Sequence, residues 1–268
     1  MFLADYHTHT CCSMDSQAQL SHQAHQAVSL GLKQLCTTDH CDLIQEKGDR
    51  LYELDWTPIL EQYEQAAHGC KGELELRLGI ELGCAQTDPE CARKILSGAP
   101  LDFVIGSIHN QSPEQGGIDF YFLEYRTQQD CYAALDDYFS SMARLVTLTD
   151  CYDVLGHIIY PLRYMKQAAG GPVTLERYQD ILREIFTAAA QAGRGIELNT
   201  YCGRTLAEWK PVLELYRDCG GEIVTIGSDA HTPEHIGLGA KQAAQLLQQT
   251  GFRYQATYLR RHAQFVKL

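Results

Sequence analysis

The strongest constraint on the fold is a repeated pattern of short apolar runs that end in metal-binding side chains. The first run, residues 3–10, carries His7 and His9 one residue apart, and in a β-strand both side chains would point to the same face. Each later run reads as a buried parallel strand. These runs end at His40, Glu81, His109, His157, and at Asp229 with His231. The pattern predicts ligands at the C-terminal ends of several strands.

The segments between these runs predict helices, several of which are ended by glycine. Helices are expected at residues 16–30, 55–67, 89–96, 129–147, 174–192, 206–218 and 233–249. Alternating strands and helices indicate βαβ units and a parallel sheet. Seven strands whose ligands must meet at one point favour a distorted (β/α)7 barrel over an open sheet, because the C-terminal mouth of a barrel gathers the strand ends.

Four segments fall outside this alternation. Residues 41–54 form a polar segment between an expected strand and an expected helix, and residues 158–172 are expected to form a loop. Residues 110–126 are irregular and aromatic, which fits either a lid over the site or a surface loop pinned by its aromatic side chains. Residues 252–268 are expected to form a short strand and an exposed basic end.

The length and charge of the chain limit its class and its partners. With 268 residues, of which 45% are hydrophobic, it can form one barrel domain over residues 1–268. It has neither a leader pattern nor an apolar run that could cross a bilayer, so we expect a cytoplasmic protein without a membrane partner. The net charge of −12 disfavours polymeric nucleic acid and fits a small phosphorylated substrate held by metals and arginines. The sequence does not indicate an oligomeric state.

The eleven cysteines are scattered, odd in number, and lack paired CxxC spacings. Most are therefore expected to be reduced and to pack as small hydrophobic residues. Cys11 and Cys12 directly follow the two histidines, which leaves open that one of them is a soft metal ligand.

The number of candidate ligands indicates more than one metal ion. A structural zinc takes four ligands, whereas six histidines and two carboxylates end the runs described above. A carboxylate such as Glu81 would then bridge two ions. Sites that mix nitrogen and oxygen ligands accept zinc, manganese or iron, so the metal stays open. The other histidines are expected to be structural or solvent-exposed: His22, His25, His68, His235 and His262.

Over essentially the whole chain, these residues resemble the polymerase-and-histidinol-phosphatase (PHP) family of metal-dependent phosphoesterases. The matching motifs are His7-Thr8-His9, Thr38-Asp39-His40, Glu81, His109, Gly156-His157 and Ser228-Asp229-Ala230-His231. The resemblance implies a trinuclear site that binds two to three divalent ions. The implied ligands are His7, His9, Glu81 and Asp229 for the first ion, Glu81, His109 and His157 for the second, and Asp15, His40 and His231 for the third.

Asp15 belongs to the segment Ser13-Met14-Asp15, which resembles the histidinol-phosphatase branch of the family in placing an aspartate there. Aspartate is also a common capping residue, so a role for Asp15 at the start of the helix expected at residues 16–30 stays an alternative. The two roles differ in whether the carboxylate meets a metal or a backbone amide.

The same branch implies substrate-binding roles for Arg163, Arg204 and Asn199. One departure concerns Gly156-His157-Ile158-Ile159, which lacks the acid that this branch often carries two residues after the histidine. An acid near the mouth, Asp42 or Glu197, is then expected to meet the ammonium group of the substrate.

The resemblance implies a metal-dependent phosphomonoesterase, and its branch implies hydrolysis of L-histidinol phosphate in histidine biosynthesis. In such a site a metal-bridging hydroxide attacks phosphorus in line while the ions neutralise developing charge. Arg163, with Arg204 second, is expected to bind phosphate oxygens, and Asp229 or His231 to protonate the leaving oxygen. The alternatives are a phosphoesterase acting on nucleotides, oligonucleotides or phosphotyrosine, and a non-catalytic metal-binding protein.

Overall fold

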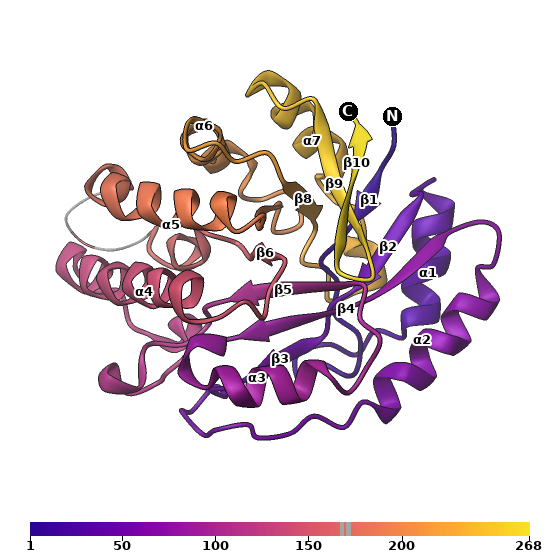
Figure 1. Cartoon of the computed structure of the whole chain (residues 1–268), viewed down its shortest axis with the longest axis horizontal. Coiled ribbons are helices and arrows are strands. Elements are labelled where there is room, and N and C mark those ends of the chain that lie inside the picture. Colours follow the sequence, from indigo (N-terminus) through magenta and orange to yellow (C-terminus); the bar gives the residue numbers. More distant parts are fainter. Residues whose placement is uncertain (167–168, 170–172) are drawn as a thin grey trace.

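The computed structural model describes residues 1–166, 169 and 173–268, and a parallel sheet occupies its centre (Figure 1). Within this described part, the main path of the sheet is β1 (Ala4–Asp5), β2 (Gln34–Thr37), β4 (Glu75–Gly83), β5 (Phe103–Ser107), β6 (Val154–Leu155), β7 (Gly195–Asn199) and β8 (Val224–Gly227). The short strand β3 (His40–Asp42) also pairs with β4. β2 and β3 together form the strand expected to end at His40, and Thr38 and Asp39 interrupt it.

Backbone hydrogen bonds from the residues that follow β1 to β8 and to the turn after β8 close the sheet into a barrel. The Tyr6 amide donates to the Ile226 carbonyl (2.9 Å), and the His9 amide donates to the Ala230 carbonyl (2.8 Å). β1 and β6 have only two residues each, so the barrel is irregular. The expected distorted (β/α)7 barrel is therefore confirmed.

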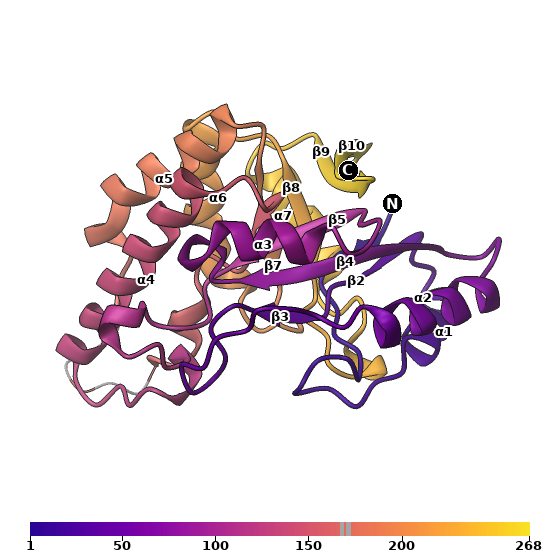
Figure 2. The same ribbon diagram turned by 60° about the horizontal axis from the view of Figure 1, so that its bottom comes forward.

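Helices surround the barrel, with α4, α5 and α6 on one side and α1 and α2 on the other (Figures 1 and 2). They are α1 (Leu20–Ser29), α2 (Thr57–Gly69), α3 (Pro89–Leu96), α4 (Gln128–Leu148), α5 (Gln179–Gln191), α6 (Trp209–Asp218) and α7 (Ala240–Gln249). Each long helix turns an apolar face inward: in α4, the buried residues Leu135, Tyr138 and Met142 recur at helical spacing. No helix in the described part of the chain is long and apolar enough to cross a membrane.

Five expected helices begin later than predicted. α2 begins at Thr57 instead of residue 55. α1 begins at Leu20 because the hydroxyl of Ser16 donates to the backbone carbonyls of His9 and His231 and does not cap a helix. The first residues of the other three form short 3-10 turns, at Glu176–Tyr178, Leu206–Glu208 and Pro233–His235. The loop expected at residues 158–172 contains a further such turn at Tyr160–Arg163, and its residues 167–168 and 170–172 lie outside the described residues.

The irregular segment at residues 110–126 is attached to the barrel by its centre. Phe120 is fully buried, and its ring meets Tyr138 of α4 edge-on at 5.5 Å. The neighbouring rings of Tyr121 and Phe122 remain 60% and 52% exposed. This arrangement supports the pinned loop over a freely moving lid.

The C-terminal tail differs from its prediction, because it forms an antiparallel hairpin of β9 (Tyr254–Leu259) and β10 (His262–Lys267). Tyr258 packs against Phe103, which begins β5, so the hairpin covers the end of the barrel where the strands begin. The basic turn of the hairpin is not free. Arg261 pairs with the buried carboxylate of Asp153, and the Arg260 amide donates to Asp102 (2.9 Å).

Candidate metal centre

A cavity of about 440 Å³ opens at the C-terminal ends of the barrel strands. The predicted ligands in its wall are Asp15, His40, Glu81, His109, His157, Asp229 and His231. His7 and His9, the other two predicted ligands, are fully buried beside Glu81 and Asp229. The fold thus brings all the predicted ligands to one end of the barrel.

His7, His9, Glu81 and Asp229 form a first group of ligand atoms. Nε2 of His7 lies 3.2 Å from Oε2 of Glu81, and Nε2 of His9 lies 3.4 Å from Oδ1 of Asp229. Atoms that bind one ion at about 2.0–2.2 Å lie roughly 3–3.6 Å from each other, so this spacing fits a shared ion. Both Nε2 atoms and Oε2 of Glu81 are buried without a hydrogen-bond partner. A cation would satisfy all three.

Glu81, His109 and His157 form a second group. Oε1 of Glu81 lies 2.8 Å from Nε2 of His157 and 3.2 Å from Nε2 of His109. The two histidine nitrogens are 3.0 Å apart. Since Oε2 of Glu81 faces the first group and Oε1 faces the second, this carboxylate has the geometry of a bridge between two ions.

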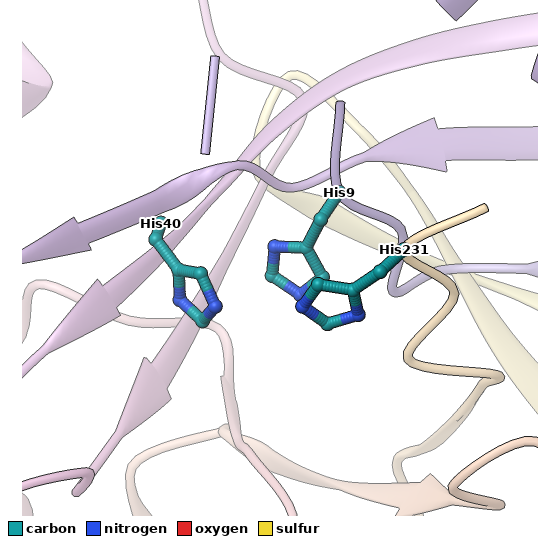
Figure 3. Close-up of side chains that lie close together, drawn as sticks. All are labelled: His9, His40 and His231. Atoms are coloured by element: carbon teal, nitrogen blue, oxygen red, sulfur yellow. The ribbon is translucent and has the colours of Figure 1, made fainter. Parts of the chain in front are cut away.

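The third group brings together three histidines from separate segments, His9, His40 and His231 (Figure 3). Asp15 lies beside two of them. Oδ2 of Asp15 lies 2.9 Å from Nε2 of His231 and 3.6 Å from Nε2 of His40. His9 also belongs here, because its ring stacks on His40 at 4.1 Å and on His231 at 4.2 Å. The structure thus places His9 between the first and third positions, whereas the sequence assigned it to the first alone.

The position of Asp15 rules out the capping alternative. α1 begins at Leu20, and the residue before it, Gln19, makes no side-chain cap. The carboxylate of Asp15 faces His231 and His40 instead. The helix therefore does not depend on this carboxylate.

Two carboxylates, the fully buried Glu197 and the partly buried Asp42, orient the histidine rings. Nδ1 of His7 lies 2.7 Å from Oε1 of Glu197, and Nδ1 of His109 lies 2.7 Å from Oδ1 of Asp42. Such a contact fixes the ring and raises the basicity of the nitrogen that faces the metal. The expectation that Glu197 meets a substrate ammonium is wrong, because Glu197 is fully buried and its other oxygen accepts the His157 amide (2.9 Å). Asp42 does line the cavity.

The carboxylates give the centre a strong preference for cations. Burial alone would raise the pKa of Glu81, but His7, His109 and His40 hold it well below its usual range. Burial would likewise lower the pKa of His40, but Glu81 and Asp15 raise it to about 10. Protons and divalent cations compete for such nitrogens, so the arrangement fits a metal site.

Comparison with known families agrees with this geometry. The PHP domain family matches residues 5–201, a stretch that contains the ligands from His7 to His157. The chain belongs to the PHP family. Asp229 and His231 follow the matched stretch, and the barrel closure brings them to the same centre.

Relatives within the PHP family are similar over nearly the whole chain. A histidinol-phosphatase of Lactococcus lactis subsp. lactis (strain IL1403) is 27% identical over 263 residues, covering 95% of this chain and 93% of the relative. A probable histidinol-phosphatase of Clostridium acetobutylicum is also 27% identical and covers 90% and 91% of the two chains.

A similar solved structure is that of histidinol phosphate phosphatase from Lactococcus lactis complexed with zinc, L-histidinol and phosphate. It is 25% identical, has a TM-score of 0.85, and covers 98% of both chains. A putative histidinol phosphatase from Listeria monocytogenes, 17% identical with a TM-score of 0.72 over 89% and 99% of the two chains, shares the fold.

Arg163 extends this PHP site along the cavity wall. Its Nη1 donates to Oδ2 of Asp229 (2.9 Å), and its Nη2 donates to Oδ1 of Asn199 (2.8 Å). A guanidinium has five N–H donors, so others remain for a ligand. Asn199 is buried behind Arg163 and is not among the described residues that line the cavity, whereas Arg204 lies exposed at its edge.

Some residues of the site were not predicted. Asp119 lines the cavity, and its Oδ1 accepts from the hydroxyl of Tyr160 (3.1 Å). His235, expected to be structural or solvent-exposed, also lines the cavity, and its only sequence signal was its closeness to His231.

Cys11 and Cys12 are in none of the metal-ligand groups formed by the described residues, and both sulfurs accept from the amide of Gln62.

Proposed function

We propose that this protein is a metal-dependent phosphomonoesterase that hydrolyses L-histidinol phosphate to L-histidinol and phosphate. The observation that carries the proposal is the bridging geometry of Glu81, whose two oxygens face two separate groups of histidines. This arrangement occurs in a chain that is similar to a histidinol-phosphatase over 95% of its length. Hydrolysis of a phosphomonoester is chemistry that clustered divalent ions perform well.

The proposed cofactors are two to three divalent ions. His7, His9, Glu81 and Asp229 would hold the first, Glu81, His109 and His157 the second, and Asp15, His40 and His231 the third, with His9 within reach of the last. Zinc is the first candidate because the Lactococcus lactis structure contains it, and manganese and iron suit the same mixed ligands. When bound, the ions would lower the pKa of water and neutralise charge on phosphoryl oxygens.

The roles proposed for the protein's own side chains follow from their charge. Arg163 and Arg204 would bind phosphate oxygens, because both line the cavity and carry permanent positive charge. Burial would raise the pKa of Asp229, but His7 and Arg163 hold it well below its usual range. Asp229 therefore stays ionised and suits a metal ligand. His231 is the other expected proton donor, and it would give the leaving oxygen a proton only while no ion occupies its Nε2. Asp15 and Asp229 raise the pKa of His231 against the effect of burial.

The amine of the substrate requires an acidic acceptor. Asp42 and Asp119 both line the cavity and can supply it. Ile159, where the family branch often has an acid, is buried. Asp119 and Asp42 thus replace the missing acid in this proposal.

A panel of phosphate esters tests the substrate. We expect the zinc-loaded protein to release phosphate from L-histidinol phosphate with a higher kcat/KM than from phosphotyrosine, nucleoside monophosphates or an aryl phosphate. If the protein preferred nucleotides or phosphotyrosine, the assignment of L-histidinol phosphate as substrate would be wrong, and the assignment as a phosphoesterase would stand. No release from any ester by protein with full metal content would support a non-catalytic metal-binding protein.

A further inference from the structure

The turn that follows β7 has an unusual backbone. Tyr201 (φ 46°), Cys202 (φ 52°) and Gly203 (φ 81°) are three consecutive residues in the left-handed region. Residues other than glycine visit this region rarely, and mostly one at a time. Such strain persists only where the surroundings enforce it, and it is concentrated at functional sites.

The neighbouring residues do enforce this conformation. The Tyr201 amide donates to Oδ1 of Asn199 (2.8 Å), and the Cys202 amide donates to the Ser228 carbonyl (2.8 Å). Oδ1 of Asn199 also accepts from Nη2 of Arg163 (2.8 Å). One amide oxygen thus ties the strained turn to the arginine on the cavity wall.

The strained turn places the Tyr201 ring against two arginines. The guanidinium carbon of Arg163 lies 4.1 Å from the centre of the ring, and that of Arg204 lies 5.1 Å from it. All three residues line the cavity. An aromatic face attracts guanidinium groups, so the ring stabilises two like charges near each other.

The two arginines differ in how else they are held. Arg163 is buried and bonded to Asp229 and Asn199, so it keeps its position without the ring. Arg204 is exposed, and its guanidinium group lies against the ring of Tyr201. A long exposed side chain samples many rotamers and loses that freedom when it binds a ligand. The ring reduces this loss for Arg204.

We propose that Tyr201 is a positioning residue that holds Arg204 beside Arg163, so that the two guanidinium groups receive the phosphate group of the ligand together. The inference rests on the proposed function, since it assumes a phosphate ester in this cavity. It assigns the role to the aromatic ring and not to its hydroxyl. It also explains why a bulky residue occupies a left-handed position.

The test compares Tyr201→Asn with Tyr201→Phe. Asparagine tolerates the left-handed backbone and removes the ring, whereas phenylalanine keeps the ring and removes the hydroxyl. Titration of zinc-loaded protein with inorganic phosphate, followed by calorimetry, measures the contact directly and needs no turnover. We expect Tyr201→Asn to weaken phosphate binding about tenfold with unchanged zinc content, and Tyr201→Phe to bind within about twofold of the wild type.

A double-mutant cycle separates positioning from general damage. If the ring acts through Arg204, then Arg204→Ala weakens phosphate binding strongly in the wild type and only slightly in the Tyr201→Asn background. Additive losses would overturn the proposal, as would wild-type affinity in Tyr201→Asn, equal losses in the Asn and Phe variants, or a wild type that does not bind phosphate. If Tyr201→Asn does not fold, Tyr201→Gly takes its place in the same cycle.

The same titration keeps this proposal distinct from the proposed function. A wild type that binds phosphate through the ring but does not hydrolyse L-histidinol phosphate would reject the substrate and keep the role of Tyr201. If the wild type hydrolyses L-histidinol phosphate and the Tyr201→Asn variant binds phosphate as tightly as the wild type, the proposed function stands and the role of Tyr201 is wrong.

Discussion

Nδ1 of His7 lies 2.7 Å from Oε1 of Glu197, and both side chains are completely buried. This contact points Nε2 of His7 toward Glu81, where it has no hydrogen-bond partner. Glu197 thus holds a proposed metal ligand in place, and it is not among the described residues that line the cavity. The contact joins β7 to the residues that follow β1, so we expect metal affinity to depend on the closure of the barrel.

Glu197→Gln tests this relationship. Glutamine keeps the shape and one acceptor but removes the negative charge that raises the basicity of His7. We expect zinc affinity to fall roughly 10–100-fold, the usual cost of losing such a partner, in competition with a coloured chelator. Glu222→Gln, at an exposed glutamate, is the matched control and should bind zinc as the wild type does. Equal affinities in the two variants would contradict the role of Glu197.

Asp15→Asn tests the third metal position. Because Asp15 faces His231 and does not cap α1, the substitution should leave the helix content of the metal-free protein, measured by circular dichroism, unchanged. Bound metal per chain, measured by elemental analysis, should fall together with the rate of phosphate release. A variant with full metal content and wild-type rate would show that Asp15 is not a ligand.

The stability of the metal-free protein and the stabilisation added by zinc should change in opposite directions with pH. In the metal-free protein, Glu81 and Asp15 raise the pKa of His40 from 6.5 to about 10, against the effect of burial. A raised folded-state pKa stabilises the fold below pH 6.5, and this contribution is lost as the pH rises toward about 10. Metal binding displaces the proton, so zinc affinity should rise over the same range.

Scanning calorimetry at several pH values between 6.5 and 10 checks both signs. The melting temperature of chelator-treated protein should fall with increasing pH, and the stabilisation added by zinc should grow. A metal-free protein whose melting temperature rises over this range would contradict the proposed charge balance.

Arg163→Ala tests the phosphate-binding role. We expect kcat/KM to fall by about 2–4 kcal/mol of transition-state stabilisation for every phosphomonoester, because the phosphate group is common to all of them. Arg163→Lys should recover little of this loss. An ammonium group cannot bind Asp229 and Asn199 and also make a bidentate contact with phosphate. Unchanged kcat/KM in Arg163→Ala would show that the arginine only pairs with Asp229.

The ligand positions could be predicted because they depend on local rules. Alternation along a strand sets His7 and His9 on one face, and parallel strands end on the same edge of a barrel, which brings Glu81 and Asp229 to them. These rules need no knowledge of side-chain packing. They therefore predicted the barrel and the location of its ligands from the sequence alone.

The partners of the ligands could not be predicted in the same way. Glu197 lies 190 residues from His7, and its inward position depends on how β7 packs beside the rest of the barrel. The hairpin of β9 and β10 was missed because its basic turn resembles an exposed tail. The sequence does not reveal that Asp102 and Asp153 are buried where that turn can meet them.

The most direct test of the account is the dependence of L-histidinol phosphate hydrolysis on zinc. Chelator-treated protein should release no phosphate, and activity should return as zinc is added and reach a plateau at two to three equivalents. Glu81→Gln, which removes the charge of the bridging carboxylate, should remain folded and inactive at every zinc concentration. Full activity of the metal-free protein, or a Glu81→Gln variant as active as the wild type, would contradict the account.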